Sequence, residues 1–137
     1  MQNTVKIFTD GGSRGNPGPA GIGYVIQNSD GQDIETGCKY IGIKTNNEAE
    51  YMALILALTQ AKKMQVETVN IFADSELMIK QLKKEYKVKQ EHLKKLLEQA
   101  ESIVKTFSGI TYTHIKRELN KQADLLVNQA LDNNKNS

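Results

Sequence analysis

Hydrophobic and polar residues alternate near the start of the chain, which is the pattern of half-buried β-strands. The segment "VKIFTD" (5–10) alternates in this way and is rich in residues that favour strands. The segment 18–42 divides at the turn sequence "NSDG" (28–31), so it predicts two further strands joined as a hairpin. We therefore expect an antiparallel meander of three strands to open the fold.

Helical and strand-like patterns alternate along the rest of the chain. Helices are expected at 45–64, 75–85, 91–107 and 120–131, and strands at 67–74 and 109–117. Strands that alternate with helices are usually joined as parallel neighbours in one sheet. The order βββαβααβα therefore predicts an α/β fold, in which a mixed five-stranded sheet (an antiparallel three-strand meander plus two parallel strands) is flanked by helices.

Length and composition fit one folded unit. The chain has 137 residues, and we expect a single domain over 1–131 followed by a polar tail over 132–137. No apolar stretch reaches the ~18 residues of a membrane-spanning helix, and "MQNTVKIF" lacks the pattern of a secretory signal. The single cysteine, Cys38, has no internal disulfide partner and is expected to be a small apolar residue of a strand. These features predict a cytoplasmic monomer with no membrane partner.

Acidic side chains stand where the predicted topology brings elements together. Asp10 and Asp74 each end a predicted strand, and parallel strands place such residues at the same edge of a sheet. Glu50 and Asp124 lie in the first turns of two predicted helices. Close carboxylates repel one another unless a cation neutralises them, and their hard oxygens suit Mg²⁺ or Mn²⁺. The alternative is that these residues, four of 16 acids in the chain, are solvated surface groups.

Four motifs, in order along the chain, resemble those of the type 1 ribonuclease H family: "TDGGSRGNPGPAG", "TNNEAEYMAL", "ADSELMIKQL" and "RELNKQADLLVNQA". Members of this family cut the RNA strand of RNA/DNA hybrids with divalent metal ions, so the resemblance implies a ribonuclease H-like fold and this activity. Carried over residue by residue, it implies two Mg²⁺ or Mn²⁺ ions held by four catalytic ligands: Asp10, Glu50, Asp74 and Asp124. The shared glutamate aligns with Glu50, and Glu48 is expected to be a first-turn acid that favours the helix dipole.

Polar residues around these carboxylates are candidates for substrate binding. The glycines that follow Asp10 are expected to let the backbone approach a nucleic-acid strand, although a plain turn would also use them. Hydroxyl, amide and guanidinium groups nearby could bind phosphates or the 2′-hydroxyls that distinguish RNA. Asn46 and Asn47 are expected to cap the helix or to contact the hybrid, one role each. The predicted set is Gly11, Gly12, Ser13, Arg14, Gly15, Asn16, Asn46, Asn47 and Ser75.

The chain departs from many type 1 members in two places. The segment "HIKRELN" is short, as in an archaeal-like subgroup, so His114 is expected to be a strand residue, and Arg117 could act on the scissile phosphate. The chain has no tryptophan and lacks the basic handle, so lysines in "KKEYKVKQEHLKK" are expected to bind substrate phosphates instead. These lysines are Lys83, Lys84, Lys87 and Lys89, and the alternative for them is a solvated helix face.

The resemblance predicts that the chain is a metal-dependent endoribonuclease, which hydrolyses the RNA strand of RNA/DNA hybrids. Two metal ions would leave 5′-phosphate and 3′-hydroxyl ends. One alternative is a weak or inactive nucleic-acid-binding module of the same fold, but such a module gains nothing by placing negative charge beside phosphates. Another is a different polynucleotidyl transferase, such as an exonuclease or an integrase-like enzyme, because the fold alone does not decide the reaction.

Overall fold

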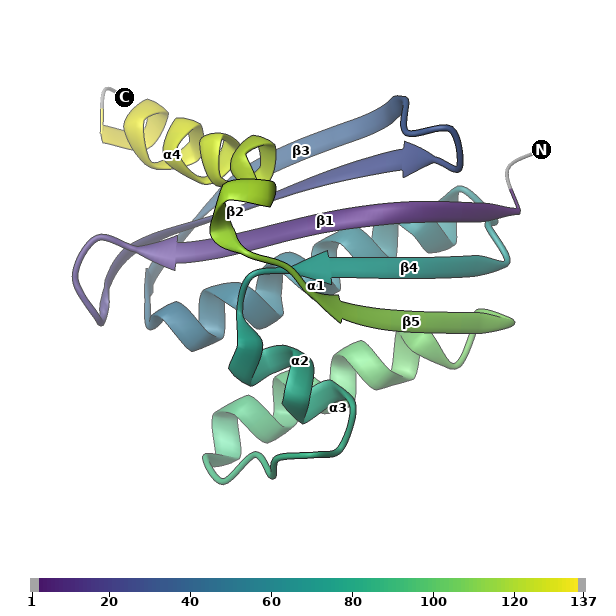
Figure 1. The fold of residues 1–137 in the computed structure, drawn as a ribbon. Helices are drawn as coiled ribbons and strands as arrows, with labels where there is room; N and C mark the ends of the chain where they lie inside the picture. The colour runs from purple at the N-terminus through teal and green to yellow at the C-terminus, as the bar shows by residue number, and fades with distance from the viewer. Residues whose placement is uncertain (1–2, 136–137) are drawn as a thin grey trace.

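The computed structural model describes residues 3–135, and its centre is a five-stranded sheet in the order β3-β2-β1-β4-β5 (Figure 1). β1 pairs antiparallel with β2, and β2 pairs antiparallel with β3, whereas β4 is parallel to both β1 and β5. The predicted mixed sheet is therefore confirmed. The strands are β1 (Thr4–Ser13), β2 (Gly18–Asn28), β3 (Asp33–Lys44), β4 (Thr68–Ala73) and β5 (Gly109–His114).

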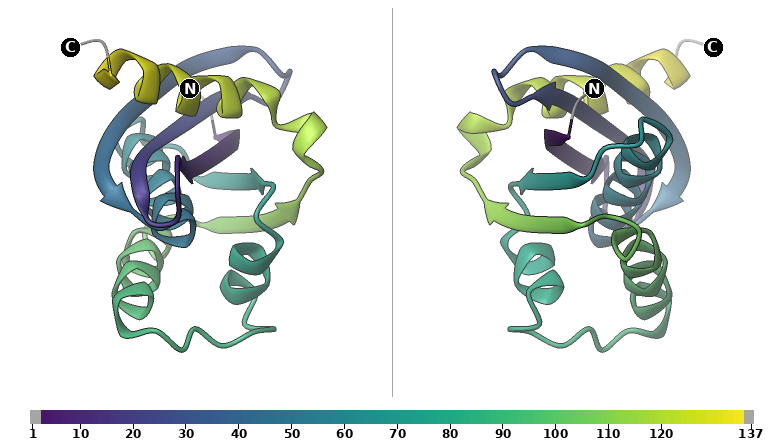
Figure 2. Two further views of the ribbon diagram at one scale, coloured as in Figure 1. Left: turned by 90° about the vertical axis from the view of Figure 1, so that its left-hand side faces the viewer. Right: turned by 90° about the vertical axis from the view of Figure 1, so that its right-hand side faces the viewer.

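Helices cover both faces of the sheet. α1 lies behind the sheet in the view of Figure 1, and α4 crosses the front of β1, β2 and β3 (Figures 1 and 2). The helices are α1 (Asn46–Lys63), α2 (Glu76–Leu82), α3 (Glu91–Val104) and α4 (Lys121–Lys135), with a short 3₁₀ helix η1 (Arg117–Leu119) before α4. The predicted order is confirmed, with η1 added. In the part of the chain that the structure describes, each helix is too short or too polar to cross a bilayer.

The last helix ends later than its sequence pattern indicates. The apolar stripe stops at Leu131, but α4 continues to Lys135, so most of the predicted polar tail is helical. Asp132 in this last part forms an ion pair with Arg14 of the β1–β2 loop, with 2.8 Å between Oδ1 and Nη2. This ion pair ties the polar end of α4 to the sheet. Residues 136–137 of the predicted tail lie outside the described residues.

The main hydrophobic core lies between the sheet and α1. Val5 and Ile7 of β1 point to this side and pack with Leu54 and Leu58 of α1, all fully buried. α3 covers the opposite side of α1, which explains why α1 has buried residues around much of its surface. Burial of this much apolar surface fixes α1 against β1. The position of α1 matters because its second turn carries Glu50.

Two expectations about individual residues were wrong, each for a local reason. Thr45, and not Asn46 or Asn47, caps α1: its hydroxyl accepts from the N–H of Glu48 at 3.1 Å, and the Glu48 carboxylate accepts from the N–H of Thr45 at 3.0 Å. This reciprocal capping box also explains the pKa of Glu48, which is lowered mainly by the hydrogen bond from Thr45. Cys38 lies in a strand as expected, but it is exposed on the edge strand β3, so the burial usual for a small apolar residue is not found.

Glycine in β2 allows α4 to approach the sheet closely. A Cβ atom at Gly23 would lie 2.8 Å from the carbonyl oxygen of Ala123 and 2.7 Å from Cβ of Leu126, closer than real contacts allow. Gly23 pairs with Asp10 of β1. The missing side chain therefore lets the first turns of α4 lie directly beside Asp10.

We predict that Gly23→Ala destabilises the protein by about 1–3 kcal/mol, as overpacking of a close contact typically does. The added methyl group must push α4 away from β2. The measurement is urea unfolding followed by circular dichroism. Gly109→Ala in β5 is the matched control, because its Cβ would meet only Thr68 at an ordinary 3.6 Å, and we expect a change below ~0.5 kcal/mol. Equal effects of the two substitutions would contradict this packing argument.

Candidate metal centre and cleft

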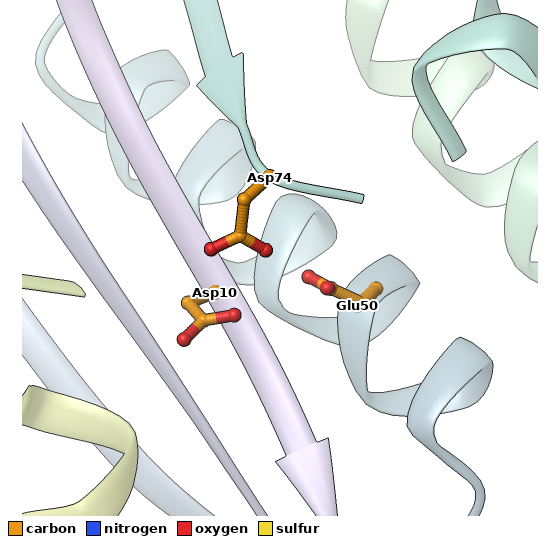
Figure 3. Close-up of side chains that lie close together, drawn as sticks. All are labelled: Asp10, Glu50 and Asp74. Carbon is orange, nitrogen blue, oxygen red and sulfur yellow. The ribbon is translucent and has the colours of Figure 1, made fainter. Parts of the chain in front are cut away.

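The two predicted aspartates lie side by side at one edge of the sheet. Thr9 of β1 pairs with Ala73 at the last position of the β1–β4 ladder, so the residues that follow them are neighbours. These residues are Asp10, which is 7% exposed, and Asp74, which is partly buried. The parallel pairing of the two strands thus places both carboxylates together, as their positions in the sequence predicted (Figure 3).

Glu50 approaches these aspartates from α1, the helix behind the sheet in Figure 1. Its side chain points from α1 toward the two aspartates (Figure 3), and its Oε1 accepts from the N–H of Gly11 at 3.2 Å. The same N–H donates to Oδ1 of Asp10 at 3.0 Å. One carboxylate oxygen from each of Asp10, Glu50 and Asp74 lies within 4.8 Å of the other two. Three of the four predicted ligands therefore form one cluster.

Gly11 has a packing role in addition to the one predicted. A Cβ atom there would lie 2.3 Å from the carbonyl oxygen of Ala49, so the glycine permits close packing of α1 against β1. Gly11 is buried, and its predicted contact with a nucleic-acid strand stays a prediction. The consequence is the short distance between Glu50 and Asp10.

Asp124 lies next to the three-carboxylate cluster, but its carboxylate oxygens do not come within 4.8 Å of all three other acids. It stands in the first turn of α4 and lines the same cleft, and its carboxyl group interacts with that of Asp10. Its Oδ1 lies 3.7 Å from Nη2 of Arg117, whose side chain is 81% exposed. The fourth predicted ligand is therefore near the cluster and paired with the arginine predicted to contact phosphate.

Burial and crowding favour the neutral forms of Asp10 and Glu50. Burial, together with the negative charge of Asp74 and the neighbouring Asp124, raises the pKa of Asp10 to about 8. Burial also raises the pKa of Glu50 well above its ordinary value, and Asp10 and Asp74 add to that shift. Each carboxylate is thus unfavourable as an isolated anion. A cation bound between them would remove this cost.

A cleft of about 470 Å³ opens over the cluster. Of the predicted substrate-binding residues, Gly11, Gly12, Ser13, Arg14 and Asn46 line it, as does Arg117. The prediction missed one wall, which α4 forms with Val127, Asn128 and Leu131. The spacing of these residues after Asp124 is that of one helix face, a signal that was present in the sequence.

The β1–β2 loop is held to the start of α1 by amide groups. Oδ1 of Asn46 accepts from the N–H of Ser13 at 2.8 Å and from its hydroxyl at 3.1 Å. The N–H of Asn46 donates to Oδ1 of Asn16 at 3.0 Å. Gly15 takes a left-handed conformation (φ 95°), which makes glycine favourable in this loop. These bonds give Asn46 and Asn16 a structural role, and they engage the hydroxyl of Ser13, a residue that lines the cleft.

The remaining predicted residues lie away from the cleft lining. Asn47 is exposed, and Ser75 caps α2 by accepting from the N–H of Met78 at 3.2 Å. Lys83, Lys87 and Lys89 are exposed residues of the segment 83–90 between α2 and α3. This segment lies far from α4, at the other end of the molecule (Figure 2, left). Lys84 is also exposed, but its ammonium group forms an ion pair with Glu101 of α3.

Comparison with known proteins agrees with this geometry. Residues 8–130 match the model of a family described as reverse transcriptase-like. The ribonuclease HI of Halobacterium salinarum is 39% identical over 128 residues, which cover 93% of this chain and 64% of that protein. The crystal structure of RNase H1 from the same archaeon, at 38% identity, superposes with a TM-score of 0.93, covering 95% of this chain and 98% of that one.

A second solved structure, LC11-RNase H1 in complex with an RNA/DNA hybrid, is 42% identical with a TM-score of 0.91, and the match covers 94% of this chain and 97% of that one. The fold and the family model thus place the chain in the reverse transcriptase-like class. Within that class, the chain belongs to the ribonuclease H family. It spans 64% of the length of the Halobacterium relative and 35% of the mycobacterial relatives.

We predict that the metal-free protein loses stability as pH rises from about 4 to about 8. Folded Asp10 keeps its proton in this range, whereas the unfolded chain releases it near pH 3.8, so folding is progressively less favourable as pH rises. Asp10→Asn should therefore raise the free energy of unfolding in EDTA at pH 8 by at least ~1 kcal/mol, the equivalent of one pKa unit, and by less at pH 5. Urea unfolding at both pH values measures this difference.

The exposed Asp30 in the β2–β3 turn supplies the control for this prediction. Asp30→Asn should leave the pH dependence of stability unchanged. If Asp10→Asn behaves like Asp30→Asn at both pH values, burial and the neighbouring acids do not disfavour the charged form of Asp10 as described.

Proposed function

We propose that this chain is a metal-dependent endonuclease that hydrolyses the RNA strand of RNA/DNA hybrids. The observation that carries the proposal is the convergence of Asp10, Glu50 and Asp74 at the base of an open cleft. The hybrid bound to LC11-RNase H1, a protein 42% identical to this chain, supports an RNA/DNA hybrid as the substrate. The relative named ribonuclease HI supports the reaction.

The donor set fits a hard divalent cation. The candidate ligands Asp10, Glu50 and Asp74 offer only carboxylate oxygens, which Mg²⁺ and Mn²⁺ prefer, and Asp124 stands close enough to complete the set. Burial first, and the neighbouring acids second, raise the pKa values of Asp10 and Glu50, and a bound cation would favour their charged forms. Two bound Mg²⁺ or Mn²⁺ ions would supply an activated water and stabilise the leaving 3′-oxygen, leaving 5′-phosphate and 3′-hydroxyl ends.

The side chains around the cluster bind and orient the substrate in this proposal. Asp124 orients a water molecule at the α4 side of the cleft. Arg117 is almost fully exposed and only loosely paired, so it can turn to a phosphate of the RNA strand and stabilise its charge. The hydroxyl of Ser13 is placed to contact a 2′-hydroxyl, the group by which proteins distinguish RNA from DNA. One chain supplies all these groups, so we expect a monomer to be active.

A non-catalytic binding module is the second candidate, and the charge of the cleft argues against it. A binding surface for phosphates gains from positive charge and loses from a cluster of carboxylates. The cluster at the base of this cleft is of the opposite sign, and it is buried at a cost. A bound cation reverses that cost, which fits catalysis better than simple binding.

We predict cleavage of the RNA strand of a labelled hybrid with Mg²⁺ or Mn²⁺, and none in EDTA. Asp10→Asn, Asp74→Asn and Glu50→Gln should each lower kcat by at least ~100-fold, because each removes a ligand charge from the cluster. Circular dichroism should show that each variant stays folded. Hybrid cleavage that persists unchanged in EDTA would overturn the proposal.

Glu48→Gln is the matched control for Glu50→Gln, because the two glutamates are neighbours on α1. Glu48 accepts the Thr45 N–H at 3.0 Å, and a glutamine carbonyl can accept the same bond. Activity should therefore stay within about twofold of the unchanged chain. Equal losses in the two variants would show that the assignment of Glu50 is wrong.

The exposed lysines between α2 and α3 are proposed to contact phosphates of the hybrid. Replacing Lys83, Lys87 and Lys89 by glutamine should raise KM with little change in kcat, because phosphate contacts contribute uniform binding. The slope of log affinity against log salt should become shallower by ~0.9 for each phosphate that the variant no longer binds, the value for B-form DNA. Lys84 is left out of this variant because it is paired with Glu101.

The control for the lysine variant carries the same change of charge at the other end of the sheet. Lys62 and Lys63 lie in the last turn of α1, and Lys105 follows α3; all three are exposed. Their replacement by glutamine should leave KM and the salt slope nearly unchanged. If both triple variants behave alike, the α2–α3 lysines are only a solvated surface.

A further inference from the structure

Asn120 is a buried side chain whose hydrogen bonds join the two sides of the carboxylate cluster. It is 1% exposed and lies between η1 and α4. Its Nδ2 donates to the carbonyl oxygen of Thr9 at 2.8 Å and to Oδ2 of Asp74 at 3.2 Å. Both partners accept hydrogen bonds, which fixes the orientation of the amide, because the reversed amide would place its oxygen against two oxygens.

The side chain of Asn120 does not perform the role usual for its position. The N–H of Asp124 donates to the carbonyl oxygen of Asn120 at 3.1 Å, so Asn120 stands at the N-cap of α4. An asparagine there commonly accepts a hydrogen bond from the first turn of the helix. Among residues 3–135, however, no donor reaches its Oδ1, which is buried. The amide is thus directed toward the sheet at the expense of the helix cap.

The two bonds formed by Nδ2 fall at the point where the sheet ends. Thr9 and Ala73 are the last pair of the β1–β4 ladder, and Asp10 and Asp74 follow them directly. The amide of Asn120 supplies the donor that a longer β4 would offer to Thr9. Its second N–H holds the carboxylate of Asp74, and Asp124 follows one helical turn later on α4. One side chain therefore connects the three elements that carry these aspartates.

We infer that Asn120 is a positioning residue, which sets the spacing of Asp10, Asp74 and Asp124 before a divalent cation binds. The inference rests on the proposed metal-dependent function. Carboxylates this close repel one another, and a donor on Asp74 opposes their separation. The donor is a neutral amide, so it orients Asp74 without adding a positive charge that would compete with the cation. Groups that orient ligands in this way commonly change metal affinity when they are removed.

The test is calorimetric titration of Mn²⁺ into the full chain without nucleic acid. Asn120→Ala should raise the dissociation constant for Mn²⁺ at least ~10-fold, the usual effect of removing such a partner. The matched control is Asn28→Ala. Asn28 is also buried, donates to Gln32 at 2.8 Å and accepts from Asp30 and Gln32 at 3.0 Å, but it is the last residue of β2, beside the β2–β3 turn.

The control separates positioning from general stability. Both variants should melt at a lower temperature, because each loses hydrogen bonds of a buried amide, but only Asn120→Ala should bind Mn²⁺ more weakly. At saturating Mn²⁺, its KM for the hybrid should stay within about twofold while kcat falls. A folded Asn120→Ala protein whose Mn²⁺ affinity is within twofold of the unchanged chain would overturn the inference.

A second measurement uses the unchanged chain and does not depend on a variant that folds. In nuclear magnetic resonance spectra, the side-chain amide protons of Asn120 should exchange slowly with water and shift as Mg²⁺ is added. Those of the exposed Asn47 should exchange quickly and stay in place. Asn120 signals that do not move at saturating Mg²⁺ would contradict the inference.

The outcomes also distinguish this inference from the proposed function. If the unchanged chain cleaves the hybrid while Asn120→Ala keeps its Mn²⁺ affinity, only the inference fails. If Asn120→Ala weakens Mn²⁺ binding while the unchanged chain cleaves no hybrid, the positioning role stands and the proposed reaction fails.

Discussion

The free-energy cost of burying several carboxylates close together is the constraint that the rest of this structure must offset. Asp10, Glu50 and Asp74 bring oxygens within 4.8 Å of one another, and the pKa values of Asp10 and Glu50 are raised as a result of burial and of this crowding. Such a cluster opposes folding at neutral pH. It persists because the packing of strands and helices around it is strong enough to hold it, which is typical of functional sites.

Close packing on both faces of the sheet creates the cluster. Gly11 lets α1 approach one face of β1, and Gly23 lets α4 approach the other face beside Asp10. At both positions a Cβ atom would collide with helix backbone. The hydrophobic core then fixes α1, and Asn120 ties the start of α4 to the ends of β1 and β4. The carboxylates are thus positioned by contacts in which they take little part themselves.

The two arginines that line the cleft each lie near an acidic side chain of α4 that is partly exposed to solvent. Arg14 pairs with Asp132, and Arg117 lies near Asp124, so α4 supplies the acidic partner in both cases. All four side chains are at least 33% exposed, and ion pairs of this kind contribute little to stability. Under the proposed function, a phosphate of the hybrid would take the place of either acid beside its arginine.

Local patterns made much of the site predictable. The positions of Asp10 and Asp74 after two strands, and the parallel pairing of those strands, followed from alternation and element order. Thr45 and Glu48 have the spacing of a capping box, but the asparagines beside them also favour the cap position, and only the structure shows that Thr45 takes it. The role of Gly11 was different: a glycine after a strand predicts a turn, and only the position of α1 shows that it is a packing contact.

Sequence patterns were enough to predict the order of strands and helices and the element that carries each carboxylate. The reason is that hydrophobic residues repeat every 2 residues in a strand and every 3.6 in a helix, and both repeats can be read from neighbouring residues. Only the tertiary structure decided which side chains meet. Asn120 reaches Thr9 across 111 positions, and Asp124 lies beside Asp10 without coming close to all three other acids, although its motif matches the family. Such distances depend on how closely each helix packs on the sheet, and that is set by contacts between segments far apart in the chain.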